Sequence, residues 1–175
     1  MLAWSSAFTS ARLVVADAPP FLALAVRFAL SGAIALGLGH ILGQRIALSR
    51  RQWAGIVVFG LCQNALYLGL NFEAMRRIEA SIAVVIASLL PLVVAALDRL
   101  AFGSRLPVLG VAGLAAGATG VLVMMTGRLS WGADPLGLLH CAIGVLALAV
   151  ATLLVRGVSD GGNLWMVVGL QMLVG

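Results

Sequence analysis

Arg27 is the residue of this sequence whose position most clearly calls for a chemical role. It lies in the otherwise uncharged apolar run from Phe21 to Ile41, seven residues beyond Pro20, which is about 10 Å into a helix by rise alone. An arginine that faces lipid at such a depth costs several kcal/mol, so the guanidinium should face a bundle interior or a wet cavity. There it would attract an anionic or carboxylate-bearing molecule. The alternative is a side chain that reaches back to the water interface.

Three other polar side chains recur at every fourth position of the third apolar run, Trp53 to Phe72. Gln63, Tyr67 and Asn71 share one face of an α-helix, and Asn64 borders them. Amides and a phenol in hydrocarbon need hydrogen-bond partners, so this face should point inward. It would either line a path for a polar molecule or join helices through interhelical hydrogen bonds.

Ser88 and Pro91 share the small-residue face of the next run. Proline removes one backbone hydrogen bond and permits a kink, and transport proteins place binding sites and hinges at interrupted helices. We expect Pro91 to act as a hinge or to shape a cavity that Ser88 lines. The alternative is a static kink, which membrane helices tolerate.

The elements that position these residues are membrane-spanning helices. The chain of 175 residues is 62% hydrophobic and 10% charged, whereas a soluble domain is about 25% charged. The runs 80–97 and 106–125 have 18 and 20 residues, enough to span a hydrocarbon core about 30 Å thick. The fold class is therefore an all-α, polytopic membrane helix bundle. We expect six full transmembrane helices, of which the first, 2–16, is short, and a truncated seventh at 164–175.

The fifth helix carries a stripe of glycines. They are Gly110, Gly113, Gly117 and Gly120. Glycines on one face let another backbone approach closely, so we expect this stripe to pack against the fourth helix. A role in homodimerisation is the alternative.

The charges indicate topology. All eleven basic residues are arginines, scattered between apolar runs, so the bilayer is the expected partner and nucleic acid is excluded. With a cytoplasmic N-terminus, the inner loops hold Arg45, Arg50, Arg51, Arg99, Arg105 and Arg156, and the outer loops hold Arg76, Arg77 and Arg128. The excess of inner arginines favours that orientation.

No pattern in the sequence indicates an enzyme, a metal site or a cofactor. His40 and His140 should lie at opposite ends of the membrane, and Cys62 and Cys141 form no motif. A nucleophile–base arrangement and a phosphate-binding loop are likewise absent from the sequence. We therefore expect neither metal nor cofactor.

A weak internal sequence similarity indicates a repeat. The residues Val15-Ala-Asp17 and Val158-Ser-Asp160 precede the second and seventh runs, and the same register aligns Gly32 with Gly175. Five helices lie between the copies, so the second copy must be inverted, as in many transporters. We divide the chain into a five-helix repeat at 1–126 and the incomplete start of a second repeat at 135–175.

The chain resembles the EamA-type permeases of the drug/metabolite transporter superfamily. The resemblance rests on Trp4-Ser5-Ser6, Arg27, the stretch from Asn71 to Ser81, Ser88-Leu-Leu-Pro91-Leu and the glycine-rich fifth helix. It departs from the family pattern at Ser104, where an acidic residue is usual, and in lacking most of the second repeat.

The resemblance implies a multi-pass protein of the cytoplasmic membrane that exports a small polar metabolite, such as an amino acid, by alternating access. A proton or other ion gradient would supply the energy. The alternative is a truncated or half-length component that acts only with another half, either a second copy or a missing C-terminal half. The expected cavity residues are Arg27, Gln63, Tyr67, Asn71 and Ser88.

Overall fold

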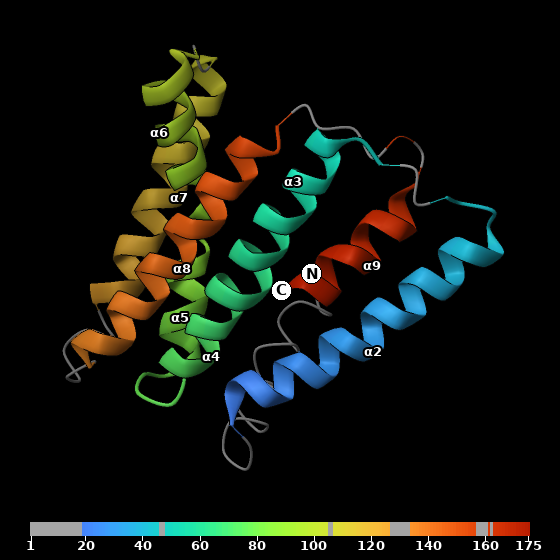
Figure 1. Cartoon of the computed structure of the whole chain (residues 1–175). Helices are drawn as coiled ribbons and strands as arrows, with labels where there is room; N and C mark the ends of the chain where they lie inside the picture. The colour runs from blue at the N-terminus through green and yellow to red at the C-terminus, as the bar shows by residue number, and fades with distance from the viewer. Residues whose placement is uncertain (1–18, 46–47, 105–106, 127–133, 157–160, 162) are drawn as a thin grey trace.

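The computed structural model describes residues 19–45, 48–104, 107–126, 134–156, 161 and 163–175, and every regular element in this part of the chain is a helix (Figure 1). The elements are α2 (Pro20–Ile41), α3 (Arg50–Gly60), the π-helix η1 (Leu61–Leu68), α4 (Gly69–Ala74), α5 (Ala80–Ala87), α6 (Leu90–Phe102), α7 (Val108–Thr126), α8 (Pro135–Leu154) and α9 (Leu164–Val174).

Four of the described stretches are long and apolar enough to cross a membrane. They are Phe21–Ile41, Arg50–Ala74, Ala80–Phe102 and Pro135–Leu154. The predicted all-helical membrane bundle is thereby confirmed. α7 adds a helix of 19 residues, and α9 has 11 residues. The first predicted segment, 2–16, lies outside the described residues.

Local sequence signals explain where several helices begin and end. Pro20 and Pro135 stand in the first turns of α2 and α8, where a missing N–H costs nothing. Ser49 and Gln52 form a reciprocal capping box at the start of α3. Gly103 ends α6 with a φ of +64°, a conformation that glycine adopts without strain.

The helix α8 runs through the middle of the described bundle. It packs against η1, α4, α5 and α6, and α7 lies at the outer side of α5 and α6 (Figure 1). The shared core contains Tyr67 and Phe72 from the stretch Arg50–Ala74, which corresponds to the third predicted helix and is hereafter the third span. It also contains Ile82 and Ile86 from α5 and Cys141 from α8, and all of these residues are buried.

Two ion pairs fasten α8 at its two ends. At its start, Asp134 pairs with Arg77 at 3.1 Å. At its other end, Arg156 pairs with Asp98 of α6, which also accepts a hydrogen bond from the hydroxyl of Ser104. Ser104 therefore contacts an acidic residue of the helix that precedes it.

The helices α2 and α9 lie side by side and antiparallel (Figure 1). A Cβ added to Gly32 would lie 3.0 Å from the main-chain oxygen of Gly169, and a Cβ added to Gly169 would lie 3.0 Å from that of Gly32. One end of the contact is closed by Gln44, whose side-chain oxygen accepts hydrogen bonds from the amides of Trp165 and Met166 at 3.0 and 3.3 Å. Glycine thus permits close backbone packing here, between the second and seventh predicted runs.

The glycine stripe of α7 differs from its predicted packing. A Cβ added to Gly113, Gly117 or Gly120 meets no atom of the described residues within 4 Å, and one added to Gly110 meets only Pro107, at 3.5 Å. The reason is the rotation of α7, whose less exposed face carries Gly110, Leu114, Ala118 and Val121. Larger side chains therefore make the contact with the neighbouring span, and Gly113, Gly117 and Gly120 face away from it.

The fourth predicted run is divided into two helices. α5 ends at Ala87, and α6 begins at Leu90 with Pro91 in its first turn. The hydroxyl of Ser88 donates a hydrogen bond to the main-chain oxygen of Val85 at 2.6 Å. Pro91 therefore stands directly after an interruption of the helix, since its ring nitrogen cannot donate the bond that would continue it.

Candidate functional site

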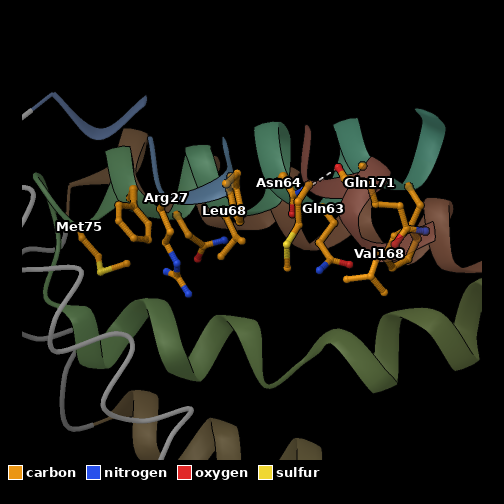
Figure 2. A pocket seen from close by; sticks show the side chains of 13 residues that line it. Arg27, Gln63, Asn64, Leu68, Met75, Val168 and Gln171 are labelled. Atoms are coloured by element: carbon orange, nitrogen blue, oxygen red, sulfur yellow. Dashed lines mark hydrogen bonds between the residues drawn. The ribbon is translucent and has the colours of Figure 1, made fainter. Parts of the chain in front are cut away.

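A cavity of about 430 Å³ lies between α2, the segment α3–η1–α4 and α9 (Figure 2). Its walls are mostly apolar and aromatic, with one guanidinium and a group of side-chain amides. The lining residues are Arg27, Phe28, Phe59, Gly60, Gln63, Asn64, Leu68, Asn71, Phe72, Met75, Val168, Gln171 and Met172. Apolar concave sites with a few convergent polar groups are typical of small-molecule binding sites.

Arg27 supplies the positive charge of this cavity. Its guanidinium carbon lies 5.9 Å from the ring centroid of Phe28, which is within the range of a cation–π interaction. No carboxylate among the described residues lies within ion-pair distance of it. Figure 2 shows Arg27 and Gln63 projecting to the same side of the cavity wall. Arg27 therefore lines the cavity with an exposed side chain, whose charge is available to a ligand.

The amides of the cavity differ in how they are held. Asn64 donates a hydrogen bond to the main-chain oxygen of Gln171 at 2.9 Å. Asn71 is completely buried and donates to the main-chain oxygen of Tyr67 at 2.7 Å. Gln63 makes no side-chain hydrogen bond within the described part of the chain. The side chain of Gln171 likewise makes no hydrogen bond among the described residues, so these two amides are the ones most able to bind a ligand.

The π-helix η1 changes the predicted polar stripe. Its hydrogen bonds run from residue i to i+5, so each turn is wider than an α-turn, and a side chain four positions on no longer stands above the first. On this segment Gln63, Asn64 and Leu68 line the cavity. Tyr67 is turned away and is buried in the core with Cys141 and Val145 of α8. The structure therefore differs from the prediction at Tyr67, while it brings Arg27, Gln63 and Asn71 together.

Two other predicted positions also lie away from this cavity. The lining residues of the cavity come from α2, the third span and α9, so neither Ser88 nor Pro91 is among them. Their place is the interruption between α5 and α6. Pro91 as a hinge stays a prediction.

Sequence reasoning missed the contribution of α9. Gln171 is the only polar side chain in that helix, and an isolated amide in an apolar run is the signal that could have indicated an inward position. It also missed the aromatic wall of Phe28, Phe59 and Phe72, because aromatic residues in apolar runs are equally typical of lipid-facing surfaces.

The arrangement can bind a molecule with an anionic group and an apolar or neutral polar body. The guanidinium of Arg27 supplies the charge partner, Gln63 supplies a neutral donor and acceptor, and the phenylalanines supply contact area. No group of three or more histidine, cysteine or acidic residues suited to a metal occurs among the described residues.

Comparison with known proteins identifies a family of membrane transporters. The model of the EamA-like transporter family matches residues 1–126, which include the second to fifth predicted helices and two of the three segments that form the cavity. Neither the curated proteins nor the solved structures contain a significant match to this chain.

Proposed function

Because the chain belongs to the EamA-like transporter family, we propose that it exports a small polar metabolite, such as an amino acid, through the cytoplasmic membrane. Transport would proceed by alternating access, with the cavity between α2, η1 and α9 as the binding site. The proposal extends the family assignment to a substrate class and a direction.

The observation that carries the proposal is the combination of charge and amides in one cavity. Arg27 and Gln63 line it from two different helices, together with Asn64 and Gln171. An unpaired guanidinium in an apolar wall is costly in a membrane, so its presence there favours an anionic ligand group. A carboxylate at Arg27 and a polar substituent near Gln63 would use both groups.

The distribution of charge supports a cytoplasmic N-terminus. Gln44 contacts Trp165, and Asp98 pairs with Arg156, so the end of α2, the end of α6, the end of α8 and the start of α9 belong to one side. The arginines of those regions outnumber Arg76 and Arg77 on the opposite side. Positive charge is typical of the cytoplasmic side, which makes the start of α2 the outer end.

The test is uptake into inverted membrane vesicles that contain the full chain. Labelled amino acids and their amides, which lack the carboxylate, are compared under an imposed proton gradient. We expect Arg27→Ala to lower transport of the acids at least tenfold, because the charge partner of the carboxylate is lost, and Arg27→Lys to retain part of it. The preference for acids over amides should disappear in Arg27→Ala.

Arg99→Ala is the matched control. Arg99 is an exposed arginine near the end of α6, so its removal changes the net charge equally but leaves the cavity intact. Equal transport by Arg27→Ala and the wild type would overturn the assignment of the cavity. Equal losses of transport in Arg27→Ala and Arg99→Ala would show that transport depends on the net charge of the protein and not on the cavity.

A second function, that of a component that transports only with another half, is favoured by α7. The faces of Gly113, Gly117 and Gly120 meet no described atom, and small residues on an open membrane helix permit close association with another helix. Detergent-solubilised mass tests it: a dimer that Gly117→Leu dissociates supports this function, and a monomer that transports contradicts it.

A further inference from the structure

The residues that line the cavity carry one formal charge, and that charge is positive. Arg27 supplies it, and none of the other lining residues is an aspartate, a glutamate or a histidine. A negatively charged group of a ligand therefore meets a partner here, whereas a positively charged group is repelled by the guanidinium. In an apolar wall, neutral acceptors alone do not offset the hydration that such a cation loses.

The four acidic residues of the described chain are all engaged outside the cavity. Glu79 accepts a hydrogen bond from the hydroxyl of Ser81 at 3.1 Å. The other three are held in ion pairs with arginines: Glu73 with Arg76, Asp98 with Arg156 and Asp134 with Arg77. Within the described residues, no carboxylate is thus placed to neutralise an ammonium group on a molecule bound beside Arg27.

Neutral hydrogen-bonding groups accompany the single charge. The side chains of Gln63 and Gln171 line the cavity and make no hydrogen bond among the described residues. Asn71 also lines the cavity, and its buried side-chain oxygen has no partner in the described part of the chain. An amide oxygen accepts from a neutral N–H or O–H group, and an amide nitrogen donates to a carbonyl. The cavity therefore provides partners for a neutral amide or hydroxyl of the ligand.

The remaining wall fits an apolar body. Aromatic rings favour offset or edge-to-face contact with one another, and thioether sulfurs make favourable contacts with rings. Three phenylalanines and two methionines line the cavity: Phe28, Phe59, Phe72, Met75 and Met172. Its volume of about 430 Å³ is within the range of sites for small organic molecules. An aromatic or branched aliphatic group would use this surface.

We propose that the ligand of this cavity is a carboxylic acid with an apolar, preferably aromatic, body and no positively charged nitrogen. An N-acylated aromatic amino acid represents this class. Its carboxylate pairs with Arg27, its neutral amide bonds to the free amides of Gln63 and Gln171, and its ring lies against the phenylalanines. The inference rests on the proposed function, which assigns this cavity as the binding site, and it narrows the substrate to derivatives whose nitrogen is uncharged.

The test is equilibrium binding to the full chain in lipid nanodiscs, with radiolabelled N-acetylphenylalanine as the probe. Three unlabelled compounds compete with it: phenylalanine, which carries an ammonium group, N-acetylphenylalanine amide, which lacks the carboxylate, and hydrocinnamate, which lacks the nitrogen. We expect phenylalanine and the amide to bind at least about tenfold more weakly than the probe, because one has an unpaired cation and the other leaves Arg27 unpaired. Hydrocinnamate should bind more tightly than phenylalanine.

Gln63→Glu is the variant that should change this preference. The substitution keeps the shape of the side chain and places a carboxylate on the side of the wall to which Arg27 also projects (Figure 2). We expect the ratio of the affinities for phenylalanine and N-acetylphenylalanine to rise about tenfold, because the ammonium group gains a partner and the extra carboxylate opposes an anion. Gln52→Glu is the matched control in the first turn of α3, outside the cavity, where glutamate also fits the capping box. It should keep the preference of the wild type.

The outcomes separate this inference from the proposed function. Binding of phenylalanine as tight as that of N-acetylphenylalanine overturns the inference, as does a lack of saturable binding of the probe. An equal ratio of affinities in Gln63→Glu and Gln52→Glu would show that the ligand does not bind in this cavity, and would overturn it too. If the probe binds as expected and no solute is transported into vesicles, the proposed function fails and the ligand class stands. If phenylalanine is transported and the probe does not bind, the proposed function stands and the ligand class fails.

Discussion

Asn64 donates a hydrogen bond from its side chain to the main-chain oxygen of Gln171 at 2.9 Å, although the two residues are 107 positions apart. Gly60 lies one turn earlier, and a Cβ added there would be 2.6 Å from the same oxygen. The third span and α9 are therefore joined by a polar contact that a glycine makes room for. Since both segments line the cavity, this contact helps to define its shape.

Asn64→Leu removes this hydrogen bond and keeps a side chain of similar volume. We expect the free energy of unfolding to fall by about 0.6–2 kcal/mol, the usual range for a hydrogen bond between membrane helices. The cost should stay modest because the oxygen of Gln171 still accepts from the amide of Gly175 at 3.3 Å. Unfolding in mixed micelles, followed by circular dichroism, measures the change.

Gln63→Leu is the control for that prediction. Gln63 is the neighbour of Asn64 on η1 and makes no side-chain hydrogen bond in the described structure, so its replacement should cost less stability. A larger loss in Gln63→Leu than in Asn64→Leu would contradict the assigned role of the Asn64–Gln171 contact.

Gly32→Ala tests the close packing of α2 on α9. The added Cβ would lie 2.8 Å from the side chain of Leu173 and 3.0 Å from the main-chain oxygen of Gly169. The backbone oxygen cannot move as a flexible side chain can, so we expect a loss of about 1–3 kcal/mol in stability. Gly37→Ala is the matched control on the same helix, because a Cβ there meets no described atom within 4 Å. Equal unfolding midpoints for the two variants would show that the α2–α9 contact contributes nothing.

The helices could be predicted from the sequence because length and hydropathy determine them locally. The predicted run from Phe21 to Ile41 and the helix α2 (Pro20–Ile41) differ by one residue. The interruption near Pro91 could also be predicted from the sequence, since a proline restricts the backbone wherever it stands.

The cavity was predicted only in part, because it depends on contacts between distant segments. Arg27 could be predicted as a cavity residue because an arginine that faces lipid within an apolar run is costly. The displacement of Tyr67 required the π-helix Leu61–Leu68, which hydropathy and α-helical periodicity do not reveal. Similarly, the sequence does not distinguish the closely packed Gly32 and Gly169 from Gly117, which faces no neighbour among the described residues. A glycine has no side chain whose polarity or size would indicate what it packs against.

Asp134 provides a test of how the stability of the protein depends on pH under acidic conditions. It precedes α8, and the hydrogen bond from the Leu136 amide, followed by that from the Arg77 side chain, holds the pKa of its carboxyl below the usual value. A depressed pKa contributes stability that is complete above about pH 4, the unfolded value, and is lost as the pH falls through the folded value. We therefore expect the unfolding temperature of the wild type to drop more steeply below about pH 4 than that of Asp134→Ser, which keeps a helix-capping hydroxyl but cannot titrate there. Parallel acid profiles for the two proteins would contradict this role, and Arg77→Gln should reduce the difference because one of the two hydrogen bonds loses its charge.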